Sequence, residues 1–315
     1  MISKASAPGK VILFGEHFVV YGKKAILASI DKRVTVTSEK ITENTISVKS
    51  DLGQLVKPTA ESIEKIDSPL KPFFYIAKEM VQKFNFEGGL NIIVESEIPS
   101  GVGLGSSSAC CVAAAASISN LFTKLSKEDI IDLAIKAERT IFKDTSGADC
   151  TVCTHGGIIE YDKQEGFKKI NSTNDFTLVI ANSGQIHSTT VTVSKVKNFI
   201  ENNEEKFSTL CEKEDLLIEN IKQALTKNDL GVIGKSMSEN QSYLEEIGIS
   251  NDRIREMIVL AENSAYGAKI TGAGDGGCII ALVNVDKLDD TLKNFQAKNY
   301  ECFSVKIDSK GLDTF

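Results

Sequence analysis

Apolar residues occur along the chain in short runs and in longer amphipathic stretches. Short runs bounded by polar or small residues predict strands, at 11–14, 25–30, 34–37, 91–96, 176–184 and 278–283. Apolar positions that recur with the period of a helix predict helices, at 72–84, 106–124, 127–142, 189–202, 205–245 (interrupted at 227–229) and 252–265. Strands and helices occur in both halves without strict alternation, which indicates an α+β fold.

The length of the chain allows two domains. Each part of a 315-residue chain can bury a core of its own. A polar stretch at 168–175 separates the first set of elements from the strand expected at 176–184. We therefore expect an N-terminal domain at 1–174 and a C-terminal domain at 175–315.

One glycine-rich loop runs directly into serines and an alanine-rich helix. Its sequence is Pro99-Ser100-Gly101-Val102-Gly103-Leu104-Gly105-Ser106-Ser107-Ser108. Glycines let backbone N–H groups approach a ligand closely, and the first N–H groups of a helix lack internal partners. Together with the helix dipole these features are typical of a phosphate site. They favour a nucleotide-binding enzyme, most simply a kinase, over a tight turn before an ordinary core helix.

Two known phosphate-binding motifs do not match this loop. A P-loop requires a lysine where the loop closes, and the chain has no lysine between Pro99 and Ser119. A dinucleotide fingerprint requires a third glycine, where this chain has Ser106.

Three other segments carry chemically active residues. Residues 7–22 place Lys10, Glu16 and His17 beside glycines at the ends of a predicted strand. Residues 269–278 form a second glycine-rich loop. In 138–149, Glu138 lies near the end of a predicted helix and Asp149 follows a short polar loop. Two carboxylates placed in this way can divide the work of phosphoryl transfer, one on Mg²⁺ and one near the attacking hydroxyl. Taken singly, these residues also fit surface ion pairs and glycine-lined turns.

Together the segments at 7–22, 98–109, 138–149 and 269–278 resemble the GHMP kinase family over nearly the whole chain. The resemblance implies a two-domain fold, with an N-terminal domain like the second domain of ribosomal protein S5, a ferredoxin-like C-terminal domain, and ATP between them. Gly15-Glu16-His17, Val19-Val20-Tyr21-Gly22 and the segment at 185–197 are most similar to members that phosphorylate the 5-hydroxyl of mevalonate with ATP and Mg²⁺.

The resemblance also implies a role for each matching residue. Asp149 would accept the hydroxyl proton and Lys10 would stabilise the developing charge, both contacting the substrate. Ser107 and Glu138 would hold Mg²⁺. The ATP phosphates would lie against residues 99–108, with Gly272, Ala273 and Gly274 closing the site from the second domain. Mevalonate would also contact Glu16, His17 and Thr189.

The chain departs from the family pattern at three places. Ser108 stands where many members have alanine. Residues 142–145 replace a His-Gly-x-Pro/Ala-like stretch, so the loop that carries Asp149 is atypical. Asp275 lies in a loop that is usually built of glycine or small residues. A carboxylate facing the phosphates would weaken ATP binding. We therefore expect Asp275 to point outward or to contact Mg²⁺ or a backbone amide.

Charge and hydropathy limit the remaining alternatives. A net charge of −7 without a basic run argues against a nucleic-acid partner. No apolar stretch has membrane-spanning length, and the start resembles a strand rather than a signal peptide, so we expect a cytoplasmic protein. The resemblance implies a homodimer. Two alternatives stay open: a family member that acts on phosphomevalonate or on the 3-hydroxyl of mevalonate, and a catalytically silent nucleotide sensor.

Overall fold

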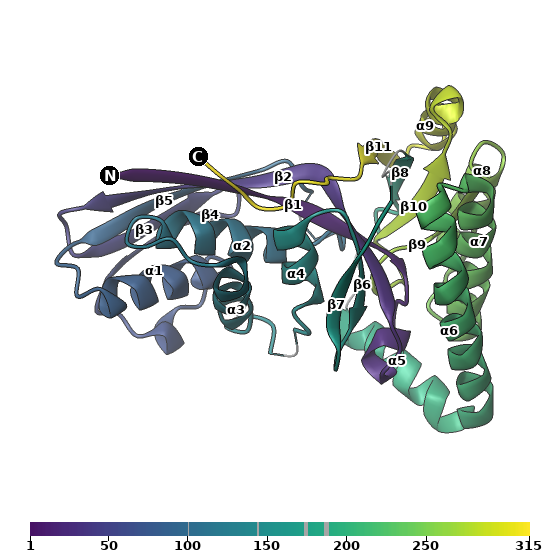
Figure 1. The fold of residues 1–315 in the computed structure, drawn as a ribbon, viewed down its shortest axis with the longest axis horizontal. Coiled ribbons are helices and arrows are strands. Elements are labelled where there is room, and N and C mark those ends of the chain that lie inside the picture. Colours follow the sequence, from purple (N-terminus) through teal and green to yellow (C-terminus); the bar gives the residue numbers. More distant parts are fainter. Residues whose placement is uncertain (100, 144, 173–175, 186–188) are drawn as a thin grey trace.

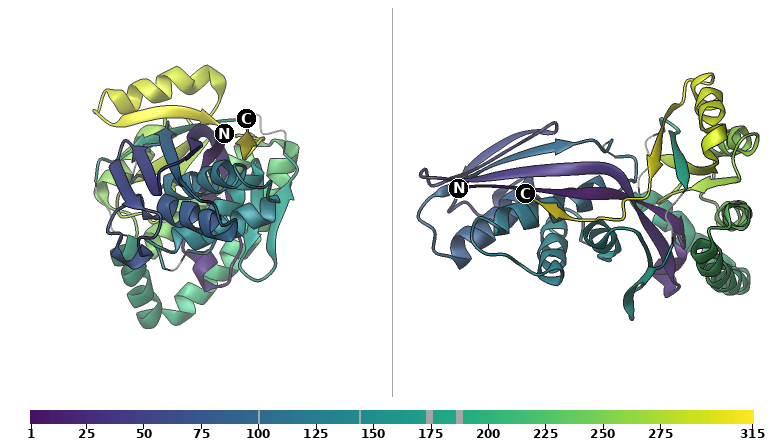
Figure 2. Two further views of the ribbon diagram at one scale, coloured as in Figure 1. Left: turned by 90° about the vertical axis from the view of Figure 1, so that its left-hand side faces the viewer. Right: turned by 45° about the horizontal axis from the view of Figure 1, so that its top comes forward.

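The fold is built on two β-sheets that lie in different parts of an elongated molecule (Figure 1). It is known from a computed structural model, which describes all residues except 100, 144, 173–175 and 186–188. Helices cover one face of the first sheet and stand outside the second sheet (Figures 1 and 2). This arrangement confirms the α+β fold expected from the sequence.

The first sheet is mixed, with strand order β12-β1-β2-β5-β3-β4 and with β6 and β7 extending from β2. Only the β3–β5 pair is parallel among the described pairs. The strands are β1 (Ile2–Phe14), β2 (Ala25–Ile41), β3 (Thr45–Ser50), β4 (Gly53–Pro58), β5 (Gly89–Ser96), β6 (Ile158–Asp162), β7 (Gly166–Ile170) and β12 (Asp313–Thr314). The helices packed on this sheet are α1 (Lys71–Lys83), α2 (Ser106–Ser119), α3 (Lys127–Glu138) and α4 (Ala148–His155).

Helix α2 is the central helix of this part. It is buried along nearly its whole length, because its alanines let it approach β1, β2 and the neighbouring helices closely. Its N-terminus, which follows the glycine-rich loop, is thereby fixed against the sheet.

The second sheet is antiparallel, with strand order β11-β8-β10-β9. Its strands are β8 (Thr177–Asn182), β9 (Gly267–Ile270), β10 (Cys278–Val283) and β11 (Glu301–Lys306). The helices of this part are α5 (Thr189–Asn202), α6 (Glu204–Lys227), α7 (Leu230–Glu246), α8 (Asp252–Glu262) and α9 (Leu288–Gln296). Short 3₁₀ helices lie at Phe18–Tyr21, Ile63–Lys65 and Val285–Lys287.

Three predicted helices end at least three residues earlier than the sequence pattern indicates, and one of them, expected at 252–265, ends at Glu262. The helix expected at 106–124 ends at Ser119, and the one expected at 127–142 ends at Glu138. Beyond α3, the Thr140 hydroxyl donates to the Ala137 carbonyl at 2.6 Å, a local bond that competes with continued helix. The early end places Glu138 at the C-terminus of α3 rather than within a longer helix.

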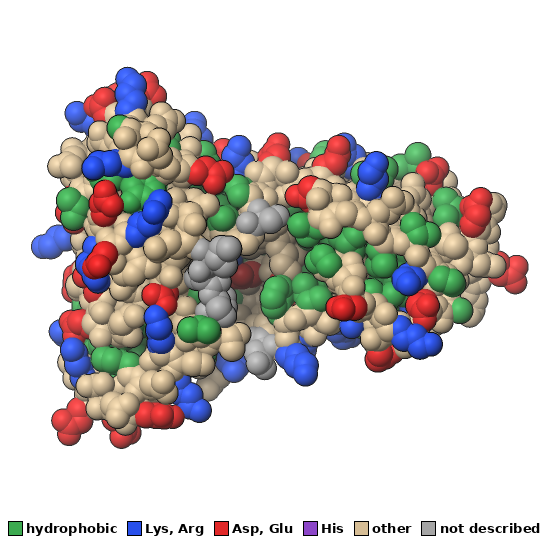
Figure 3. Space-filling model, turned by 180° about the vertical axis from the view of Figure 1, so that it is seen from behind, with side chains coloured by type: hydrophobic (Ala, Val, Ile, Leu, Met, Phe, Trp, Pro, Cys, Tyr) green, Lys and Arg blue, Asp and Glu red, His purple; other side chains and the backbone are tan. Residues whose placement is uncertain are grey.

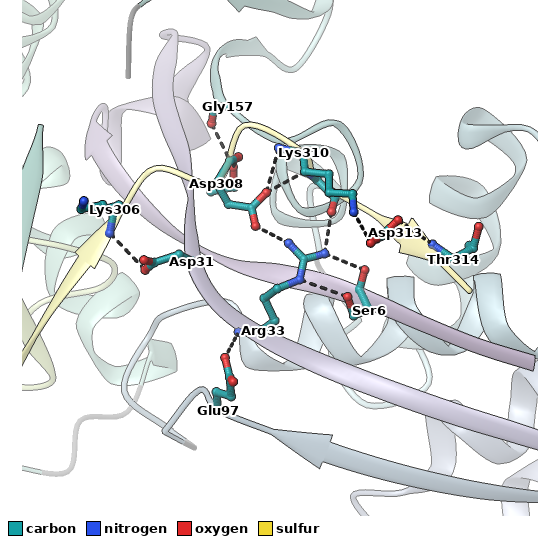
Figure 4. Close-up of polar contacts among 12 residues, drawn as sticks. Ser6, Asp31, Arg33, Glu97, Gly157, Lys306, Asp308, Lys310, Asp313 and Thr314 are labelled. Atoms are coloured by element: carbon teal, nitrogen blue, oxygen red, sulfur yellow. Dashed lines mark hydrogen bonds and ion pairs between the residues drawn. The ribbon is translucent and has the colours of Figure 1, made fainter. Parts of the chain in front are cut away.

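The last residues of the chain return to the first sheet. Strand β12 pairs with β1, and the Phe315 N–H donates to the Lys4 carbonyl at 2.8 Å. Arg33 on β2 anchors this return (Figure 4): its guanidinium pairs with the Asp308 carboxylate and donates to the Gly311 carbonyl at 2.7 Å. The expected domain boundary lies between β7 and β8. Strand β12, at the end of the chain, nevertheless belongs to the first sheet.

Among the residues that the structure describes, no helix is long and apolar enough to cross a membrane.

Candidate active site

Lys10 and Asp149, predicted as the catalytic pair, lie together between β1 and α4. The Lys10 Nζ is 3.2 Å from the Asp149 Oδ2, and their side chains are 6% and 34% exposed. Asp149 stands in the first turn of α4, where the helix dipole favours a carboxylate. The pair therefore combines a buried ammonium with a carboxylate that a substrate can reach.

The glycine-rich loop shapes the N-terminus of α2 as an anion site. Gly101, Gly103 and Gly105 all have positive φ, and Gly105 is the residue that precedes the helix. The N-cap residue Gly105 has no side chain that could cap the helix, and the first turn carries no acidic residue, so its first N–H groups can donate to a phosphate. Of the other predicted phosphate contacts in this loop, Pro99 and Val102 are half-buried, Leu104 is buried, and Ser100 lies outside the described residues.

β1 and the loop are joined directly. The Lys10 N–H donates to the Leu104 carbonyl at 2.9 Å. A Cβ at Gly105 would lie 2.6 Å from the Lys10 Cγ, so only glycine fits beside this lysine. The loop that would bind phosphates therefore also determines where the Lys10 side chain lies.

The second glycine-rich loop packs against the first segment from the other domain. The Thr271 hydroxyl accepts from the Ile12 N–H at 3.0 Å and donates to the Ile12 carbonyl at 3.1 Å. Gly272 and Gly274 have positive φ, and a Cβ at Gly272 would lie 4.0 Å from the Gly103 carbonyl oxygen. The two glycine-rich loops, distant in sequence, thus face each other.

Asp275 does not stand alone in the second loop. Its carboxylate forms an ion pair with Lys195 on α5, and its N–H donates to the Ile249 carbonyl at 2.7 Å. The carboxylate is neutralised by a lysine, a partner that the sequence did not identify.

Glu138 lies beside the serines of α2. The Ser108 hydroxyl donates to Glu138 Oε1 and the Thr145 hydroxyl to Oε2, both at 2.6 Å. Within α2, Glu138 therefore contacts Ser108 directly. Ser107, the predicted metal ligand, is the residue before Ser108 and is half-buried. Carboxylate and hydroxyl oxygens are suitable donors for Mg²⁺. The residues present therefore fit the magnesium ion that the resemblance implies.

His17 lies beside the second loop rather than on the surface. Its backbone has φ 61°, and its Nε2–H donates to the Ala273 carbonyl at 2.8 Å. Burial lowers the pKa of the imidazole, which favours the neutral ring. The side chain of Thr189, at the start of α5, lies outside the described part of the chain.

Glu16 is buried in an ion pair that the sequence reasoning missed. Its carboxylate contacts the Nζ of Lys269 on β9, and both side chains are 0% exposed. A lysine within the otherwise small and apolar run at 267–270 is the sequence signal that could have revealed the pair. Whether Glu16 contacts a substrate stays a prediction.

Glu214 on α6 is a second buried carboxylate near this pair. Its Oε2 accepts from the Asn240 side chain at 2.7 Å, and its Oε1 has no hydrogen-bond partner in the described structure. Burial, together with the nearby Glu16, raises the pKa of Glu214 from 4.5 to about 7. The folded protein therefore retains a proton here at pH values where an unfolded chain has lost it.

Replacing Glu214 by Gln should flatten the pH dependence of stability. Because the pKa is higher in the folded state, stability falls as pH rises from 4.5 to about 7, and a shift of this size corresponds to about 3 kcal/mol. The free energy of unfolding, measured with urea, should fall between pH 5 and pH 8 in the wild type. In Glu214→Gln this fall should be smaller by about that amount. Glu212→Gln, on the exposed side of the same helix, is the control. An unchanged difference in Glu214→Gln would show that Glu214 ionises normally.

Family and structure comparisons agree with this geometry. Two family descriptions match, "GHMP kinases N terminal domain" at 72–157 and "GHMP kinases C terminal" at 221–302. A mevalonate kinase of Aeropyrum pernix is 31% identical over 98% of this chain and 97% of its own length. The crystal structure of Methanococcus jannaschii mevalonate kinase matches with a TM-score of 0.85, at 29% identity over 98% of both chains. The L. major mevalonate kinase in complex with R-mevalonate matches with a TM-score of 0.82, at 25% identity over 98% of this chain and 96% of that chain.

Proposed function

Because this chain belongs to the GHMP kinase family, we propose that it transfers the γ-phosphoryl group of ATP to the 5-hydroxyl of mevalonate. The observation that carries the proposal is the Lys10–Asp149 pair beside the uncapped N-terminus of α2. Relatives named mevalonate kinase match nearly the full length of the chain, which supports mevalonate over other acceptors of the family.

The reaction needs a base at the hydroxyl and positive charge at the phosphates. Asp149 accepts the proton of the attacking hydroxyl, and the Lys10 ammonium stabilises the negative charge that develops on the oxygen. The N–H groups at the start of α2 bind the phosphates, with Gly272, Ala273 and Gly274 opposite them. Phosphoryl transfer depends mainly on positioning and charge neutralisation, which these groups supply.

Magnesium and the acceptor contacts are part of the same proposal. Ser107 and Glu138 would hold Mg²⁺, which neutralises charge on the transferred phosphoryl group. His17 and Thr189 would contact mevalonate. A cytoplasmic location and a homodimer, both expected from the sequence, also remain proposals.

The surface between the two domains offers access to this region. Figure 3 shows a hollow between the two parts of the molecule, with hydrophobic side chains gathered beside it on the part drawn at the right. A hollow of this kind between two domains is a usual place for a small-molecule site.

A direct test is ADP release from Mg²⁺-ATP with mevalonate, 5-phosphomevalonate, homoserine and galactose as separate acceptors. We expect turnover with mevalonate and none with the others. Turnover with another acceptor would keep the kinase chemistry and reject the proposed substrate. ATP binding without turnover on any acceptor would favour the nucleotide-sensor alternative.

A further inference from the structure

The Glu16–Lys269 ion pair joins the two domains in a place that solvent does not reach. Glu16 follows β1 in the first domain and Lys269 lies on β9 in the second. The Lys269 Nζ contacts the Glu16 carboxylate and donates to the Ile270 carbonyl at 2.5 Å. With its side chain fully buried and its ammonium held in this way, Lys269 is not placed to contact ATP or an acceptor.

The pair is one of three contacts between the same two segments. Thr271, two residues after Lys269, binds both backbone groups of Ile12. His17, the residue after Glu16, donates to the carbonyl of Ala273. The segment that carries Lys10, Glu16 and His17 is thereby attached to the second glycine-rich loop at three successive points.

His17 needs external support for its backbone conformation. A positive φ is unfavourable for a residue with a side chain, and His17 has φ 61°. Gly15, which precedes the buried Glu16, packs so tightly that a Cβ there would lie 2.6 Å from the Ala25 Cα. Glu16 lies between the tightly packed Gly15 and His17, whose imidazole contacts Ala273. Because the Glu16 side chain is anchored by Lys269, it fixes the backbone direction at His17.

Stability alone does not explain a fully buried ion pair. Desolvation of both charges offsets much of their attraction, so apolar residues of similar size are often at least as stabilising. A pair retained under these conditions is better explained by the geometry that it imposes.

We propose that Lys269 is a positioning residue that acts through Glu16 to hold His17 on the acceptor side of the active site. Glu16 is then an internal anchor rather than a substrate contact, and closure of the second glycine-rich loop is coupled to the placement of His17. The acceptor-binding role of His17 rests on the proposed function, but its coupling to Lys269 does not.

The test uses a variant in which both charges are removed. Lys269→Met alone leaves Glu16 buried without its cation and should lower the melting temperature strongly. Adding Glu16→Gln removes the second charge and should restore much of the loss. In this double variant we expect kcat/KM for mevalonate to fall between about 10- and 10²-fold, since a small misplacement of a contact is sufficient for such losses. The KM for ATP should change less.

Coupling through His17 is tested by non-additivity. If the pair acts through His17, adding His17→Ala to the double variant should cause no further loss of kcat/KM, although His17→Ala alone is harmful. Asp215→Asn removes an ion pair with Lys23, at 2.6 Å and outside the site, and should keep the wild-type kcat/KM. Additive losses would overturn the proposal, as would a double variant with wild-type kcat/KM.

A measurement without substrate separates this proposal from the proposed function. His17 is one of three histidines in the chain, so its imidazole can be assigned and titrated by NMR. Burial lowers its pKa in the wild type, and release of the loop in the double variant should bring the pKa back towards 6.5. An unchanged titration would contradict the coupling. A shifted titration in a protein that does not phosphorylate mevalonate would reject the proposed function and keep the coupling. The single variant Glu16→Gln, which preserves shape, gives the same readouts if the double variant does not fold.

Discussion

Replacing Asp149 by Asn lowers kcat by about 10²–10⁴-fold, the range expected when a general base is lost. Asn has nearly the same shape, so the first turn of α4 and the position of Lys10 should persist. ATP should bind with nearly unchanged affinity, because the phosphates contact the N-terminus of α2 and the glycine-rich loops. Single-turnover rates and ATP affinity, measured on the same preparation, separate the two effects.

A matched control for this variant is Asp215→Asn. Asp215 also forms an ion pair with a lysine, at 2.6 Å from Lys23, but outside the site. This variant should keep the wild-type kcat, because the pair lies outside the site. The fold should persist, because exposed ion pairs contribute little to stability. If Asp149→Asn retained more than about a tenth of the wild-type kcat, Asp149 would not be the base.

Gly105→Ala should abolish most activity while the fold persists. The new Cβ would lie 2.6 Å from the Lys10 Cγ, so either Lys10 or the start of α2 must move. Displacement of a reacting group by about 1 Å can cost about 10²-fold in rate. We therefore expect kcat to fall by about that factor, together with a moderate loss of stability from alanine at φ 72°.

Gly166→Ala separates backbone strain from the displacement of Lys10. Gly166 has φ 83° and would meet no atom within 4 Å, and it begins β7. Both variants should lower the melting temperature through backbone strain, Gly105→Ala the more because of its clash with Lys10, but only Gly105→Ala should lower kcat. Equal kcat in Gly105→Ala and the wild type would show that the position of Lys10 is not critical.

Much of the fold follows from local patterns in the sequence. The strands at 25–30, 91–96 and 278–283 and the helices from 189 to 262 alternate or repeat clearly enough to be recognised, and the structure contains them. The hairpin of β3 and β4 and the strand β7 were missed, because they are short and partly exposed and so show only a weak pattern. Strand β6 was missed because it has only five residues, although its first four are buried. Helix α4 was also missed: with buried residues on all sides, it shows no amphipathic period.

The site follows a similar division. Lys10, Asp149 and the glycine-rich loops could be proposed as candidates because their residue types and spacing have a chemical reason, and the structure brings Lys10 and Asp149 together. Lys269, Glu214 and the contact of Ser108 with Glu138 could not, since each depends on a partner from a distant part of the chain. The buried position of Glu16 belongs to this second group, and it changes the role that the residue is proposed to have.

In the proposed mechanism Asp149 and Lys10 serve a phosphoryl transfer to the primary hydroxyl of mevalonate. Proton-coupled ³¹P NMR of the product identifies the oxygen that is phosphorylated, because a phosphate on the 5-oxygen is adjacent to a CH₂ group and one on the 3-oxygen is attached to a carbon without hydrogen. We expect a triplet with the wild type and no product signal with Asp149→Asn under the same conditions. A product resonance without proton coupling, or an undiminished triplet from Asp149→Asn, would contradict this mechanism.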